Sequence, residues 1–132
     1  MSFSEINSKR LLVVKLKNGD DVLKDLEREL KEAHVSNGVI LTGVGSTTSY
    51  HVHVVDSDTL PVDNIFFRDA APFDIVNIQG HVFNGRVHAH ISLADAINAN
   101  QVGGHLESGC KVLTFCAITV MEIDPIGEFD LI

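Results

Sequence analysis

Two histidines stand two residues apart in a run where apolar and polar residues alternate. The run Arg86–Ala94 has a period of two, which predicts a β-strand with one apolar face and one face carrying His88 and His90. Their side chains point the same way from backbone positions about 6.5 to 7 Å apart. Imidazoles at this spacing can lean onto one metal ion, with each nitrogen about 2.0 to 2.1 Å from zinc. The pair Gly103–Gly104 allows a sharp turn that brings His105 back, so the sequence predicts a metal site made of His88, His90 and His105.

Neutral imidazoles suit zinc, and the sequence leaves nickel, copper and iron open. Three protein ligands leave a fourth coordination position, which water normally fills and where its pKa can fall to about 7. That arrangement permits hydrolysis or hydration chemistry without requiring it, so whether the protein is an enzyme stays open. Arg86 lies on the histidine face by parity, where it can grip an anionic ligand or form an ordinary surface ion pair.

Several other polar residues fall near the predicted site. Glu107 and Asp95 can act as a general base or as partner of an imidazole, although an exposed loop carboxylate is the simpler interpretation of each. Ser92, on the histidine face, can hold an imidazole or bound solvent. Cys110 and Cys116 have no identifiable activating base, and we expect them to be small buried apolar residues.

A second pair of histidines with the same spacing is His51 and His53, in the alternating run Thr47–Val55. No further histidine follows it after a glycine pair, so a surface or subunit-interface position is favoured. The nearby segment 43–46 (GVGS) lacks the third glycine of a dinucleotide fingerprint and the lysine of a phosphate loop. It therefore predicts a bulge or tight packing at glycine.

The remaining patterns place the histidines in a small mixed fold. Asn18–Gly19 ends a first strand that we expect to be buried on both faces, and Asp20 is the expected N-cap of an amphipathic helix that ends near Asn37–Gly38. Asn84–Gly85 is a strong hairpin signal. The other strands are expected at Arg10–Lys17, Val39–Val44, Thr47–Val55, Ala71–Gly80 with an extension to Phe83, and Lys111–Ile123. Loops are expected at Asp56–Asn64 and Asp95–Gln101, and a short apolar segment at Ile65–Phe67. One helix and six or seven strands predict a single α+β domain over residues 1–132, with a mainly antiparallel sheet and one or two flanking helices.

Composition narrows the classes of function. The 132 residues contain 18 acidic and 10 basic side chains, a formal net charge of -8 that disfavours direct binding to nucleic acid. No apolar run reaches the ~20 residues that a membrane-spanning helix needs, and the first ten residues lack the apolar region of a signal peptide. Two cysteines make no disulfide framework. We therefore expect a cytoplasmic protein without a membrane anchor.

The segments VHAHISLAD and GGHLESGCKVLTF resemble the plant-and-prokaryote-conserved (PPC) domain, as do APFDIVNIQGHV and the opening NGDD, helix and GVILTGVGS. The resemblance spans roughly Arg10 to Ile123 and implies an α/β fold with a mainly antiparallel sheet that assembles into a homotrimer. Several prokaryotic relatives look like metal-binding proteins whose histidines match His88, His90 and His105. Plant relatives add an AT-hook and use the domain to bind each other and transcription factors. This chain has no Arg-Gly-Arg-Pro hook, and Pro72 and Asp74 replace the arginine and glutamate of the plant signature.

Two functions therefore remain open from the sequence. The first is a metal-binding protein, with zinc in a three-histidine site and a small anionic ligand or substrate of unknown identity. The second is a trimeric module that binds other proteins or acts in transcription without catalysis, in which the histidines are structural.

Overall fold

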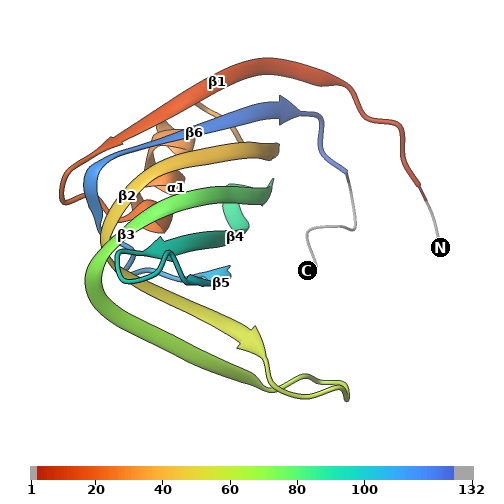
Figure 1. Ribbon diagram of the computed structural model, residues 1–132. Helices are drawn as coiled ribbons and strands as arrows, with labels where there is room; N and C mark the ends of the chain where they lie inside the picture. Colours follow the sequence, from red (N-terminus) through yellow and green to blue (C-terminus); the bar gives the residue numbers. More distant parts are fainter. Residues whose placement is uncertain (1–2, 127–132) are drawn as a thin grey trace.

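The computed structural model describes residues 3–126 and contains one helix and six strands in that part of the chain (Figure 1). In chain order the elements are β1 (Ser8–Lys17), α1 (Val22–Glu32), β2 (Gly38–Val55), β3 (Asn64–Phe83), β4 (Arg86–Asp95), β5 (Gln101–Leu106) and β6 (Val112–Ile123). The fold is a single domain with a mostly antiparallel sheet and one helix, as predicted. The sequence-based expectation missed β5.

The strands form one sheet in the order β1-β6-β2-β3-β4-β5, and every pairing is antiparallel. Strand β2 is long enough to have two neighbours on one side. It pairs with β6 from Gly38 to Thr47 and then with β5 at Val52 and His53. Because β5 also pairs with β4, the strands β2, β3, β4 and β5 close on one another, and this closure brings β4 and β2 to either side of β5.

Strands β2 and β3 are each one continuous strand where the sequence predicted shorter pieces. The predicted break at residues 43–46 is an irregularity in the β2–β6 register between Gly45 and Thr47. A Cβ on Gly45 would lie 1.9 Å from the carbonyl oxygen of Phe115, so only glycine lets β6 approach this closely. The prediction of a bulge with tight packing at glycine is thereby confirmed.

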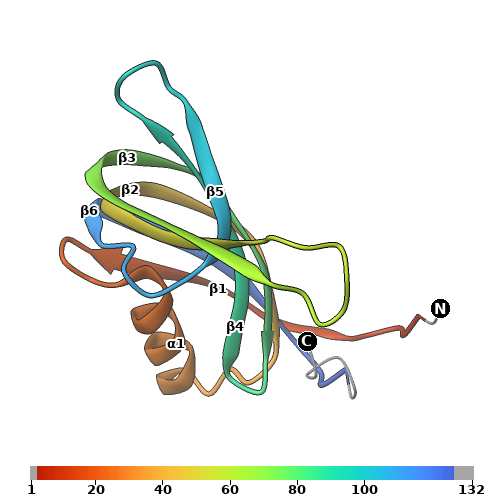
Figure 2. The same ribbon diagram turned by 90° about the horizontal axis from the view of Figure 1, so that it is seen from below.

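Helix α1 covers one side of the sheet and lies next to β1 and β4 (Figure 2). Its apolar residues Val22, Leu26 and Leu30 are fully buried there. The N-cap is Asp21 and not Asp20 as predicted: Asp21 Oδ1 accepts a hydrogen bond from the Lys24 backbone N–H at 3.0 Å. The Asp20 carboxylate instead accepts from the Lys17 N–H, which closes the turn before the helix. The helix ends at Glu32, five residues before the predicted Asn37–Gly38 stop.

The other side of the sheet is largely uncovered, so the expectation that the first strand is buried on both faces was wrong. In β1, Leu16 is buried whereas Leu11 and Val13 are 68% and 65% exposed. Strands alternate their side chains between two faces, and only one face of β1 meets the helix. Val44, Val76 and Phe115 extend this exposed apolar surface across β2, β3 and β6.

The end of β2 and the start of β3 extend together away from the other strands (Figure 1). We call the paired segments 50–55 and 64–69, with the loop 56–63 between them, the arm. Val52, which pairs with Leu106 of β5, is buried. The exposed apolar side chains of the arm are Val54, Val55, Leu60, Val62, Ile65, Phe66 and Phe67.

The hairpin turn between β3 and β4 is where the sequence predicted it. Asn84 and Gly85 have positive φ angles of 51° and 80°, as a tight hairpin turn between β3 and β4 requires. Cys110 and Cys116 are buried and unpaired, and burial raises the pKa of their thiols to about 11 and about 12. Within residues 3–126 no helix combines the length and the apolarity that a bilayer-spanning helix needs. The end of the acidic tail, residues 127–132, lies outside the described residues.

Candidate metal centre

Every histidine of the chain except His34 lies on one face of the closed part of the sheet. His105 on β5 is paired directly with His53 on β2 and with His90 on β4, and directly paired residues share a face. His88 is two residues before His90 on the same strand and pairs with His81 on β3. We call this surface the histidine face; its members are His51, His53, His81, His88, His90 and His105.

Two glycines allow β5 to enter between β2 and β4. A Cβ on Gly104 would lie 2.7 Å from the carbonyl oxygen of His53, and a Cβ on Gly103 would lie 2.4 Å from that of Ile91. Both contacts are with backbone, which cannot rotate away. The predicted sharp turn at this pair was wrong, because both glycines lie within β5. They nevertheless bring His105 beside His90, as expected, because they let β5 approach β4. They also bring it beside His53 on β2, which was not predicted.

The three predicted ligands, His88, His90 and His105, lie close together. The ring centres are 4.6 Å apart for His88 and His105, 5.8 Å for His90 and His105, and 6.1 Å for His88 and His90. Rings that share a tetrahedral zinc ion have centres roughly 5 Å apart, given a zinc–nitrogen distance near 2 Å. The ring centres are thus near the spacing of a shared ion, but the group whose ligand atoms already lie within 4.8 Å of one another is His53, His105 and Glu107. Shared ligation by His88, His90 and His105 stays a prediction.

His53 and Glu107 also belong to the cluster, and sequence reasoning missed the position of His53. His53 Nδ1 donates to Glu107 Oε1 at 2.5 Å, and His105 Nδ1 lies 3.7 Å from the same oxygen. His53, His105 and Glu107 each offer a ligand atom within 4.8 Å of the others, a group that could hold a metal ion. The His51–His53 spacing was the signal in the sequence, but only the β2–β5 pairing shows where it leads. His51 itself donates from Nδ1 to the Ser108 carbonyl at 2.8 Å.

The surroundings of two of the imidazoles favour their neutral form. Burial lowers the pKa of His88, and neighbouring His90 and Arg86 lower it further. Burial also lowers the pKa of His105, with added contributions from His53 and His88 that outweigh the opposing effect of Glu107. The Nδ1 atom of His105 is buried without a hydrogen-bond partner among the described residues. A neutral imidazole is the form that ligates metals, so these environments suit ligands.

Two of the other predicted site residues have structural roles. Asp95 Oδ1 accepts hydrogen bonds from the backbone N–H groups of Ile97, Asn98 and Asn100, so it caps the loop between β4 and β5. The Ser92 hydroxyl donates to Gln101 Oε1 at 3.2 Å, which links β4 to the start of β5.

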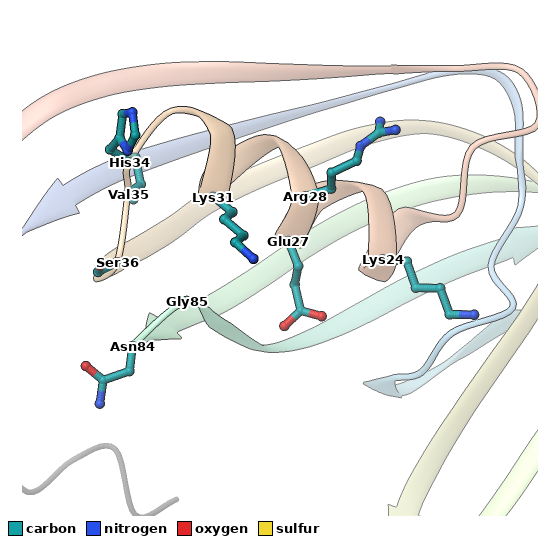
Figure 3. A pocket seen from close by; sticks show the side chains of 9 residues that line it. All are labelled: Lys24, Glu27, Arg28, Lys31, His34, Val35, Ser36, Asn84 and Gly85. Carbon is teal, nitrogen blue, oxygen red and sulfur yellow. The ribbon is translucent and has the colours of Figure 1, made fainter.

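Hollows flank the cluster on two sides. One of about 630 Å³ is lined by His53, His88, His90 and His105 together with Val54, Val55, Val62, Asn64 and Gly104. A second of about 370 Å³ is lined by His81, His88 and His90 with residues of β2 and β3. A third of about 750 Å³ lies elsewhere, between α1 and the Asn84–Gly85 turn, where Figure 3 shows Lys24, Glu27 and Lys31 around it. That hollow contains His34 but no residue of the histidine face.

The family model of the Plants and Prokaryotes Conserved (PCC) domain, the domain also abbreviated PPC, matches residues 3–124. The chain is a PCC-domain protein. The resemblance seen in its motifs is therefore confirmed over nearly the whole chain.

Curated relatives of this PCC-domain protein are much longer than it is. The chain is 27% identical over 117 residues to the bifunctional protein GlmU of Synechococcus sp. (strain JA-3-3Ab), a match that covers 87% of the chain but 17% of the relative. The shared region is thus a small part of that protein.

Solved structures share the fold. A metal-containing protein from Archaeoglobus fulgidus matches with a TM-score of 0.82 at 21% identity, over 95% of this chain and 87% of that one. A PPC protein from Pyrococcus horikoshii matches with a TM-score of 0.77 at 18% identity, over 94% and 85%. A candidate DNA-binding protein from Bacteroides thetaiotaomicron matches with a TM-score of 0.70 at 22% identity, over 89% and 83%. At these identities the likeness shows the fold alone.

Proposed function

We propose that this PCC-domain protein binds one divalent transition-metal ion on its histidine face, with His88, His90 and His105 as ligands and zinc as the first candidate. The observation that carries the proposal is the meeting of these three rings, from two different strands, within 6.1 Å of one another. The similar fold of a metal-containing protein from Archaeoglobus fulgidus supports it. When bound, such an ion would act as a Lewis acid and lower the pKa of a coordinated water to about 7.

His53 and Glu107 fit a supporting role better than a ligating one. The His53 and His105 rings are stacked, with centres 4.2 Å apart and planes inclined by 22°. The nitrogen lone pairs of stacked imidazoles lie in two nearly parallel planes about 4 Å apart, so the two rings cannot both point at one ion without a ring rotation. The His88 and His105 rings are perpendicular, which imposes no such obstacle.

In this role Glu107 orients the rings of His53 and His105, because its carboxylate lies next to the Nδ1 atom of each. It holds the Nδ1–H of His53 and lies near the Nδ1 of His105, which leaves the Nε2 of His105 for the ion. A carboxylate next to the distal nitrogen of a ligating histidine fixes its ring orientation and makes it a better ligand.

Elemental analysis of protein purified without an affinity tag tests the metal proposal. We expect one metal ion per chain in the wild type and a loss of most of it in His88→Ala, His90→Ala and His105→Ala. His34→Asn is the matched control, because His34 is exposed at the end of α1 with φ 59°, a conformation that asparagine tolerates. Metal-free wild-type protein, with a melting temperature that metal does not change, would refute the proposal. Metal lost in His53→Ala and Glu107→Ala but kept in His88→Ala would assign the ligands to His53, His105 and Glu107 instead.

We also propose that the chain forms a homotrimer in the cytoplasm. The uncovered face of the sheet presents Leu11, Val13 and Phe115, and the arm presents Phe66 and Phe67. Exposed apolar surface of this kind is typical of subunit interfaces. The buried free thiols fit a reducing compartment. Light scattering after gel filtration should give three times the chain mass, and Val13→Lys should reduce it; a monomeric wild type would contradict the trimer.

The second candidate function is a module that binds other proteins or acts in transcription without a metal. The exposed apolar face favours it, since a protein partner can cover the same surface. The similar fold of a candidate DNA-binding protein from Bacteroides thetaiotaomicron also supports this second function. The net charge of -8 disfavours a direct role on DNA. Filter binding of duplex DNA at low salt should detect no complex, whereas salt-sensitive retention would restore that role.

A further inference from the structure

We propose that the hollow beside the histidines binds a short-chain aliphatic carboxylate, with the carboxylate at the open position of the metal and the alkyl chain against the valines of the arm. The inference deepens the proposed function and depends on it. The hollow of about 630 Å³ is lined by the three proposed ligands and also by Val54, Val55 and Val62. A molecule that reached the ion from this side would therefore contact the valines.

The charges of the metal ion and of the residues around it favour an anionic ligand. Three neutral imidazoles leave the two positive charges of the ion uncompensated. Among the residues that the structure describes, no aspartate or glutamate lines the hollow. The carboxylate of Glu107, next to His53 and His105, supplies one negative charge, so the site keeps a net charge of about +1. A carboxylate from outside would complete the site.

Three valines form an apolar wall of the hollow. Val54, Val55 and Val62 belong to the end of β2 and the loop after it, and they are 40%, 59% and 40% exposed. Methyl groups on this wall gain nothing from a polar or charged ligand, but an alkyl chain would remove them from water. Full burial of each methylene should strengthen binding about fourfold, so affinity should rise with chain length until the wall is covered.

Calorimetric titration of the zinc-loaded full-length protein with acetate, propanoate, butanoate and pentanoate tests this ligand class. We expect the dissociation constant to fall two- to fourfold per added carbon, and butanol, which lacks the carboxylate, to bind at least tenfold more weakly than butanoate. Equal affinity for all four acids, or for butanol and butanoate, would overturn the proposal. Elemental analysis of the same samples comes first, because a wild type without metal would refute the proposed function itself, and this inference with it.

Variants of the wall locate the alkyl chain. Val55→Ser and Val62→Ser should retain metal and acetate binding but lose most of the gain from acetate to pentanoate. Ile97→Ser is the matched control, since Ile97 is 80% exposed and lies outside the hollow. An unchanged chain-length dependence in both valine variants would overturn the proposal. So would a change in their oligomeric mass on gel filtration with light scattering, because it would assign the valines to a second copy of the chain.

Discussion

The Nδ1 atom of His53 lies 2.5 Å from Oε1 of Glu107, which joins β2 to the residue just after β5. The pair stands beside His105, whose own Nδ1 is 3.7 Å from the same carboxylate oxygen. One carboxylate therefore faces two stacked imidazoles. Under the proposed function it positions them while His88 and His90 complete the ligand set.

Glu107→Gln should weaken metal binding without abolishing it. The amide keeps the shape of the side chain but loses the negative charge that makes the neighbouring imidazole a better ligand. We expect a 10- to 100-fold rise in the dissociation constant for zinc, measured by competition with a chelating dye. Glu32→Gln, at the exposed end of α1, is the control and should change nothing. Complete loss of stoichiometric metal in Glu107→Gln would instead make Glu107 a ligand.

Gly104→Ala should disrupt the site through the backbone. Its new Cβ would lie 2.7 Å from the carbonyl oxygen of His53, so β5 must move away from β2 and carry His105 with it. We expect a loss of about 1 to 3 kcal/mol in the free energy of unfolding, measured in urea, together with reduced metal content.

Gly19→Ala separates a loss of stability from a loss of the site. Gly19 has φ 90°, and a Cβ added there would meet no atom within 4 Å, so alanine strains only the backbone. It should destabilise the fold by about 1 kcal/mol and leave the metal content intact. If Gly104→Ala retained metal to the same extent as Gly19→Ala, the close approach of β5 to β2 would not be what positions His105.

The metal-free protein should lose stability as the pH falls below about 6.5, the usual pKa of a histidine in an unfolded chain. Burial lowers the pKa of both His88 and His105 in the folded state. Between the lowered pKa and 6.5 the unfolded chain therefore binds more protons than the folded chain, which shifts the equilibrium toward unfolding. Urea denaturation across this range measures the loss, and NMR titration of the imidazole signals identifies the groups. Titration of both histidines above 6.5 would contradict the prediction.

Asp21→Ala should destabilise the fold more than Asp20→Ala. Asp21 is 4% exposed, caps α1 and also accepts a hydrogen bond from the Gly109 backbone N–H at 2.7 Å. Loss of an N-cap costs about 1 to 2 kcal/mol, and the half-buried Gly109 N–H would lose its partner as well. Asp20 holds only the Lys17 N–H in the preceding turn, so its replacement should cost less in urea denaturation. Equal losses would mean that the cap and the contact with Gly109 together contribute no more than the turn bond of Asp20.

Local patterns in the sequence were enough to predict much of the secondary structure. The alternation around His88 and His90 predicts β4, the Asn84–Gly85 pair predicts the turn before it, and the spacing of Leu26 and Leu30 predicts α1. These signals are carried by neighbouring residues, because side-chain direction repeats every two residues in a strand and every 3.6 in a helix. The same strand pattern is sufficient to place His88 and His90 on one face.

Which residues join the histidine cluster depends on contacts between segments that are distant in the sequence. That His53 faces His105, and that Glu107 serves both, follows from the pairing of β2 with β5, whose residues are about fifty positions apart in the chain. Gly103 and Gly104 can belong to a turn or to a crowded strand, and only the neighbouring backbones distinguish the two. The sequence by itself determined which residues can form strands, a helix and metal ligands. Tertiary structure decided which of them meet, because strand register depends on backbone hydrogen bonds and packing that no local pattern specifies.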